Sequence, residues 1–345
     1  MVVESECARL SECSGCDCSK HEDKRRVVWV EVGRVLATVL IVGYHMPSSE
    51  FPATSEPLVW SCVKNFFCGA GGPLLFFFVL SGYFAPKSIS SKWMHRIVML
   101  LAAYVAWNCI FAFGLRDEVS LSRIFGLNGK ICADYPMWYV LVLAELILCQ
   151  LLGRIGIYIL GVVACWSYWQ LGTEWPIPVR DYIIVPNPQY VVAYVLGYVC
   201  SCVSLARIQR VFLYGAPVLL LVRIFDLPAG MHEALSAGLL LSVGSMLQVA
   251  LPCVARWVAA LAPAAFLCYA MHAGVILGCS MLLVRFSPQV AALPLFYGLL
   301  PFVIYAVSML AMVFMRRYTP ALLPLLAYSG RLGWLEKLLN LRRGA

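Results

Sequence analysis

The sequence has few charged residues. They make up 13% of its 345 residues, whereas 62% are hydrophobic. A soluble domain usually carries about a quarter charged residues. With so few charges the chain could not cover its surface in water, so the composition excludes an ordinary soluble protein. The mean hydropathy of +0.82 predicts that lipid surrounds most of the chain.

Three further signals are missing. No short apolar stretch near the start ends at a small-residue cleavage site, so we expect no cleavable signal peptide. The net charge is +8, but Lys and Arg interrupt hydrophobic runs instead of forming a stripe with exposed aromatics, so nucleic acid is not an expected partner. Most of the 15 Cys residues lie within apolar runs, where a thiol behaves as a small hydrophobe, and we expect them to be free.

Residues 1–26 form a separate polar segment with its own Cys cluster. Cys13, Cys16, Cys18 and His21 could in principle bind zinc, but their spacing matches no standard paired CxxC framework. Reduced cytoplasmic thiols, with or without lipid modification, are the favoured interpretation. We therefore predict a Cys-rich cytoplasmic tail and no metal site.

The rest of the chain is a series of hydrophobic stretches. Crossing a bilayer takes about 20 apolar residues. Such stretches occupy residues 27–46, 60–84, 97–114, 136–152, 155–171, 189–206, 211–225, 233–250, 263–284 and 293–315. They predict an all-α, polytopic transmembrane bundle of about ten helices over residues 27–317. Residues 331–343 mix Leu and Trp with Arg and Lys, which predicts an interfacial amphipathic helix in a cytoplasmic tail, 318–345.

The basic residues in the connections predict the orientation. With the N-terminus inside, the cytoplasmic segments hold eighteen Lys and Arg residues and the outer segments hold six. Cytoplasmic connections carry the excess of Lys and Arg in membrane proteins. We therefore expect a multi-pass protein of the cell (inner or plasma) membrane with both termini in the cytoplasm.

The first span carries Glu31, Arg34 and His45, and ionisable residues within a membrane span are costly. Arg34 and His45 are separated by eleven positions, close to three full helical turns, so they share a face at roughly 16 Å along the axis. Glu31 lies one turn before Arg34 and can pair with it. This stripe favours a passage with a cation near one end and an imidazole near the other. The alternative is that Arg34 snorkels to the inner interface and His45 caps the helix.

The spacing Arg34-x10-His45 resembles the first-helix signature of the acyltransferase-3 family of integral membrane O-acyltransferases. Three further segments fit the same family in order: FFFVLSGYF (76–84), PMWYVLVL (136–143, with Trp138) and YAMH (269–272, with Tyr269 and His272). Together they cover nearly all of the predicted membrane portion. After the second span the family usually has Arg-x-x-Arg, whereas this chain has SKWMHR.

The resemblance implies transfer of an acyl group, commonly acetyl, from cytoplasmic acyl-CoA to a hydroxyl of a surface glycan or other envelope molecule. Acyl-CoA is then a co-substrate, and no permanently bound cofactor is expected. His45 is expected to be the general base, because its unperturbed pKa lies nearest neutral pH. Arg34, oriented by Glu31, would hold the donor. Acceptor choice is expected to depend on the outer connections 47–59, 115–135 and 172–188.

Five further residues are candidates for donor binding. Lys92, His95 and Arg96 lie where CoA phosphates would enter, although Lys contacts phosphate only as a point charge and all three could simply be cytoplasmic anchors. Ser81 and Tyr83 could donate hydrogen bonds to the developing oxyanion. For Ser81 the favoured alternative is close helix packing at Ser-Gly.

Two more polar residues lie within predicted spans. Glu145 is seven residues after Trp138 on one helix face and could partner Arg34 or His272. His272 could equally make an interhelical hydrogen bond. A different class of function also remains open, a transporter or flippase of a lipid-linked glycan or small polar solute with these side chains along its pathway. We find no paired repeats of the kind that many transporters show.

Overall fold

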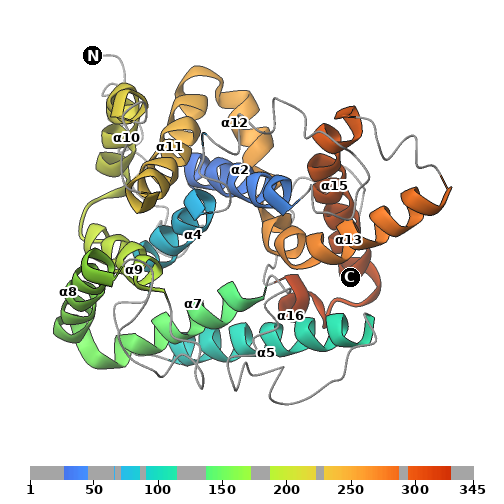
Figure 1. Cartoon of the computed structure of the whole chain (residues 1–345), viewed down its shortest axis with the longest axis horizontal. Helices are drawn as coiled ribbons and strands as arrows, with labels where there is room; N and C mark the ends of the chain where they lie inside the picture. Colours follow the sequence, from blue (N-terminus) through green and yellow to red (C-terminus); the bar gives the residue numbers. More distant parts are fainter. Residues whose placement is uncertain are drawn as a thin grey trace, which may run out of the picture.

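The structure is a computed structural model that describes residues 27–45, 66, 71–85, 91–114, 137–171, 187–222, 229–286 and 294–327. Every regular element in this part of the chain is a helix, as the sequence predicts (Figure 1). The predicted Cys-rich tail 1–26, the connections 47–59 and 115–135, nearly all of 172–188 and the predicted amphipathic helix 331–343 lie outside the described residues.

Each of the ten predicted spans coincides with helix. The longer elements are α2 (Val28–His45), α4 (Gly71–Tyr83), α5 (Ser91–Gly114), α7 (Trp138–Leu148), α8 (Gly153–Leu171), α9 (Pro188–Cys200), α10 (Leu205–Val222), α11 (Ala229–Ala250), α13 (Ala265–Phe286) and α15 (Pro294–Tyr318). The shorter elements are η2 (Cys149–Leu152), α12 (Pro252–Ala259), η4 (Ala262–Ala264) and α16 (Leu323–Ala327).

Seven segments of the described chain are long and apolar enough to cross a membrane. By helix length and hydropathy the chain is therefore a multi-pass membrane protein. The number differs from ten for two reasons. Helices α4 and α9 have only 13 residues each. In addition, α7, η2 and α8 form one apolar segment, Trp138–Gln170, interrupted at Gly153, whose φ of 69° lies in the left-handed region that favours glycine.

Helices α4 and α9 run parallel in very close contact. A Cβ atom added at Gly82 would lie 1.9 Å from the Tyr194 carbonyl oxygen, and one added at Gly197 would lie 1.9 Å from that of Val79. Small residues allow such backbone approach between membrane helices, where van der Waals packing replaces the hydrophobic effect as the driving force. The favoured sequence interpretation of Ser81-Gly82, close helix packing, is therefore confirmed for the glycine.

Helix α2 lies at the centre of the described structure and packs against α4, α11, α12, α13 and α15 (Figure 1). It runs antiparallel to α11, because the Trp29 backbone N–H donates to Gln248 Oε1 (3.1 Å) and Gly244 packs on the Trp29 carbonyl. At the other end of α11, Glu233 contacts Gly71, the first residue of α4. Helices α4 and α11 therefore begin together, on the side where α2 ends.

Helices α8 and α10 lie at the periphery (Figure 1). Helix α8 packs mainly on α9, and α10 packs on α11. Their outer faces expose large apolar side chains, including Trp166 (59%), Trp169 (85%) and Val211 (66%). These faces fit contact with lipid.

Candidate functional site

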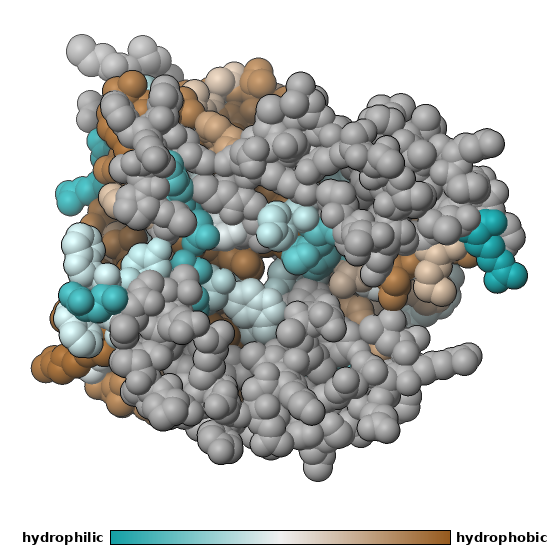
Figure 2. Space-filling model, viewed as in Figure 1, coloured by the Kyte–Doolittle hydropathy of each residue, from teal (hydrophilic) through white to brown (hydrophobic). Residues whose placement is uncertain are grey.

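A cavity of about 280 Å³ lies among α2, α4, α5, α7 and α13. Its polar lining comes from Glu31, Arg34, Ser81, Arg96, Tyr139 and Tyr269, and its apolar walls include Leu74, Phe77, Leu100, Leu143 and Phe266. Figure 2 shows the molecule hollowed near its centre, with hydrophilic side chains at the rim. The cavity is thus mostly apolar with a few charged groups, as small-molecule sites usually are.

The charged end of the cavity is an ion pair within α2. Arg34 Nη1 lies 3.2 Å from Glu31 Oε1, so the structure forms the pair that the i,i+3 spacing predicts. The Arg34 side chain is 36% exposed and that of Glu31 13%. Thr38 donates from Oγ1 to the Arg34 carbonyl (2.9 Å). Both charged groups line the cavity.

A second guanidinium enters the same cavity from α5. Arg96 lines it and donates from Nη1 to the Phe84 carbonyl at 3.4 Å. Ser81 lines it from α4. One acidic and two basic side chains therefore face this space, which favours a ligand with an anionic group.

The other predicted donor-binding residues lie elsewhere. His95 is exposed and does not line the cavity. Lys92 lies in the first turn of α5, and its side chain is outside the described structure. Tyr83 donates from its hydroxyl to the Val203 carbonyl (2.8 Å), which ties the end of α4 to the α9–α10 connection. The structure therefore gives Tyr83 a packing contact and no place in the cavity wall.

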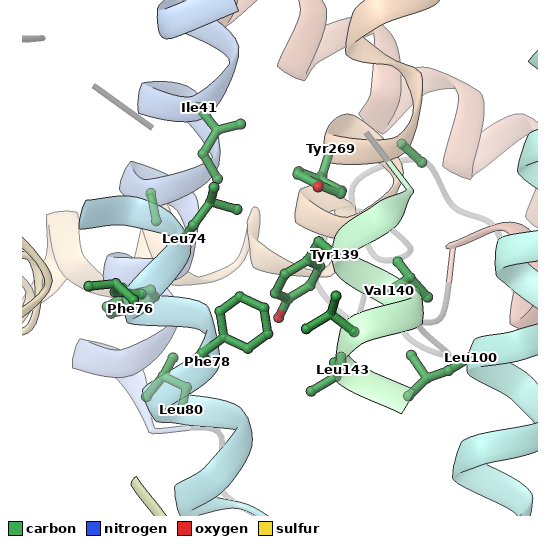
Figure 3. Close-up of a cluster of buried hydrophobic side chains, with 14 of the residues drawn as sticks. Ile41, Leu74, Phe76, Phe78, Leu80, Leu100, Tyr139, Val140, Leu143 and Tyr269 are labelled. Carbon is green, nitrogen blue, oxygen red and sulfur yellow. The ribbon is translucent and has the colours of Figure 1, made fainter. Parts of the chain in front are cut away.

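Tyrosine and phenylalanine rings form the opposite wall. Tyr139 and Tyr269 both line the cavity, with ring centroids 5.6 Å apart. Phe78 packs against Tyr139 at 4.8 Å. Figure 3 shows Phe78 from α4 and Tyr139 from α7 turned toward one another, with Tyr269 from α13 nearby. The sequence analysis missed Tyr139, although it stands beside Trp138 in the quoted segment PMWYVLVL.

Two imidazoles meet behind Tyr269. The ring centroids of His45 and His272 are 5.0 Å apart, and the ring of Tyr269 lies 5.8 Å from that of His272. His272 is 1% exposed, whereas His45, at the end of α2, is exposed. His272 Nδ1 lies 2.5 Å from the Tyr269 carbonyl, and because a carbonyl only accepts, Nδ1 carries the proton.

The histidine pair was not predicted. The sequence placed Arg34 and His45 on one face of α2. The structure shows that α13 contributes a residue near each of them. Tyr269 lines the cavity that Arg34 enters, and His272, one turn later, contacts His45. Only the packing of α2 on α13 reveals this link.

Glu145 does not join the site. Its Oε2 atom is buried without a hydrogen-bond partner among the described residues, and it does not line the cavity. The expectation that Glu145 partners Arg34 or His272 is wrong within this part of the chain. Trp138 is also absent from the cavity wall and packs instead on Tyr190, with centroids 5.4 Å apart.

The described residues contain no group of three His, Cys, Asp or Glu side chains that could hold a metal ion. The eight Cys residues described are free. A comparison with protein-family models finds no match, and comparisons with curated proteins and with solved structures find none either.

Proposed function

We propose that the chain is a membrane-embedded O-acyltransferase. It moves an acyl group, most simply acetyl, from cytoplasmic acyl-CoA to a hydroxyl of a surface glycan or other envelope molecule. The observation that carries the proposal is one connected arrangement. A cavity entered by Arg34 and Arg96 is bounded by Tyr269, behind which lies the His45–His272 pair. The four sequence segments that resemble the acyltransferase-3 family contribute residues to this arrangement or to the helices around it.

The cationic end suits the phosphate-bearing part of the donor. Arg34 and Arg96 come from different helices, so a phosphate between them receives charge-assisted hydrogen bonds from two directions. Glu31 holds the Arg34 guanidinium through its ion pair. The apolar walls then accept the uncharged arm that carries the thioester. In this assignment the thioester carbon lies toward Tyr139 and Tyr269.

The histidine end suits activation of a hydroxyl. A hydroxyl is a weak nucleophile, and a positioned neutral imidazole can take its proton as the oxygen attacks the thioester carbon. The new C–O bond forms, the C–S bond breaks, and the leaving thiolate takes the proton from the imidazolium. His45 is the proposed base because it is exposed to an incoming acceptor. The ring of His272 lies against it and can orient it.

The proposed topology puts each substrate on its own side. With about ten crossings and both termini in the cytoplasm, the start of α2 and the ends of α4 and α11 face the cytoplasm, where acyl-CoA is found. The end of α2, with His45, then faces outward. The excess of basic residues in the predicted inner connections supports this direction.

The test uses membranes from cells that overproduce the chain, supplied with radiolabelled acetyl-CoA. We expect label in a glycan fraction, and a raised apparent KM for acetyl-CoA in Arg34→Lys, because Lys cannot form the bidentate fork. Trp169→Leu, on the exposed face of α8, is the control variant. Absence of transfer by the wild-type chain would contradict the proposal, and accumulation of an unmodified solute in vesicles would favour the transporter alternative.

A further inference from the structure

The cavity ends before it reaches the histidine pair. Tyr269 is among the residues that line it, whereas neither His45 nor His272 is. The Tyr269 ring lies 5.8 Å from that of His272, which lies 5.0 Å from that of His45. The three rings therefore form a row that begins at the cavity wall and ends at the exposed end of α2. Tyr269 is the member of this row that faces the cavity.

The Tyr269 ring separates the two ends of the proposed reaction. The base His45 lies beyond it, and the thioester is assigned to the cavity before it. A passage that stayed open would admit water, and the same base would activate it. Attack by water would release acetate and the thiol, so the acyl group would be lost. Enzymes avoid such side reactions by closing the site to water.

The Tyr269 ring is held in place, and it also has room to move. It is 7% exposed and meets Tyr139 edge to face, with centroids 5.6 Å apart at an interplanar angle of 70° (Figure 3). This geometry is favourable for an aromatic pair. A long side chain on a helix takes one of two χ1 rotamers and leans over the turn before it. One turn before Tyr269 is Ala265, whose small side chain also lines the cavity and leaves space for the ring to change rotamer.

We propose that Tyr269 is a gate between the cavity and the histidine pair, and that it makes the chain select the acceptor hydroxyl over water. With the ring in the observed position, the thioester is kept from His45 and from water at the end of α2. Rotation of the ring when the acceptor binds joins the two compartments, and the bound acceptor then excludes water itself. The gate rests on the proposed function, because it assumes acyl-CoA in the cavity.

Hydrolysis of acetyl-CoA without an acceptor tests the gate, measured as release of free thiol by the full chain in nanodiscs. The water oxygen bonds to the thioester carbon and the C–S bond breaks. The thiolate takes the proton that the imidazole removed from water, and the acetic acid formed ionises. Tyr269→Ala removes the ring, and we expect hydrolysis about tenfold or more above the wild-type rate, since the base then meets water. Tyr269→Phe keeps the ring and should return hydrolysis to the wild-type rate.

Three further variants separate the gate from a general loosening of the protein. Tyr305→Ala removes another buried tyrosine ring, 4% exposed on α15 and outside the cavity wall, and should hydrolyse acetyl-CoA as the wild type does. His45→Ala combined with Tyr269→Ala should lose the extra hydrolysis, because the proposed base is gone. Tyr269→Leu retains an apolar side chain but lacks the flat ring. The same rise is expected there, so it replaces Tyr269→Ala if that variant does not fold.

Transfer to the glycan is measured on the same samples. Wild-type hydrolysis in both Tyr269→Ala and Tyr269→Leu contradicts the gate, as does an equal rise in Tyr305→Ala or a rise that persists without His45. Intact transfer in those cases leaves the proposed function standing. A His45-dependent rise in a chain that never modifies a glycan supports the gate and contradicts transfer to a glycan. Neither hydrolysis nor transfer in any sample contradicts both.

Discussion

Helices α2 and α10 are both 18 residues long and similarly hydrophobic, yet they occupy opposite environments. In α2, 61% of the span is buried, whereas in α10 only 6% is. Helix α2 contains Glu31, Arg34 and His45 and is surrounded by other helices. Helix α10 exposes apolar side chains on its outer face. Hydropathy places both in the membrane but does not distinguish them. The surroundings of the ionisable residues do: Arg34 pairs with Glu31 and lines the cavity, whereas Arg207 and Arg210 of α10 are exposed.

The largest difference between the packed interior and the peripheral α10 is expected when a glycine in each is replaced by leucine. Gly82→Leu forces a side chain into the Tyr194 carbonyl, since even a Cβ would lie 1.9 Å away. We expect a loss of about 3 kcal/mol or more in the free energy of unfolding. Gly215→Leu in α10 meets nothing within 4 Å and should leave stability unchanged. Thermal unfolding in detergent measures both, and equal losses would contradict the assigned packing.

A smaller effect is expected from a buried amide. Gln150 accepts from Trp93 Nε1 (3.0 Å) and donates to the Tyr194 hydroxyl (2.8 Å), all three being buried. Gln150→Leu leaves two buried polar groups without this partner, at a cost of about 1–3 kcal/mol. Gln170→Leu, exposed on α8, is the matched control. Similar unfolding midpoints for the two variants would show that the buried hydrogen bonds add nothing.

Replacement of Arg34 is expected to weaken ligand binding. Arg34→Ala removes one of the two guanidiniums that line the cavity, and we expect at least tenfold weaker binding of acetyl-CoA, about 1.4 kcal/mol. Arg210→Ala removes an exposed guanidinium from α10 and should leave binding unchanged. Equilibrium dialysis with labelled acetyl-CoA gives both constants. Equal weakening would indicate a general charge effect and no specific donor site.

The smallest effect is expected on the outer face of α8. Trp166→Leu replaces one large apolar side chain, 59% exposed, with another. Its effect on the free energy of unfolding should stay within about 0.5 kcal/mol. A larger loss, measured by the same thermal unfolding, would mean that this face contacts protein and not lipid.

Much of the fold followed from local pattern. Long apolar runs predicted the positions of the ten longer helices but not of the short α12 and α16, and the Glu31–Arg34 pair followed from helical spacing alone. The sequence predicted two spans, 136–152 and 155–171, where the structure has one apolar segment, Trp138–Gln170, interrupted at Gly153, because hydropathy cannot tell an interrupted segment from two crossings. Helix α9 was predicted as the span 189–206 but ends at Cys200, because an apolar run does not mark where a helix ends.

The tertiary part of the site was beyond the sequence. His45 and His272 are far apart in the chain and meet only because α2 packs on α13. Tyr139 lines the cavity, whereas Trp138 and Glu145 do not. Spacing shows which residues of α7 share a face, but only the packing of neighbouring helices decides which face lines the cavity. Tyr83 stands in the motif with Ser81, yet only Ser81 lines the cavity.

The most direct test of the account is the rate of acetyl transfer from acetyl-CoA to the glycan by His45→Ala, measured beside acetyl-CoA binding on the same protein. A general base contributes about 100-fold or more. The account predicts at least that loss of rate in His45→Ala, with acetyl-CoA binding unchanged, since His45 does not line the cavity. Acetyl transfer by His45→Ala at the wild-type rate would contradict the account.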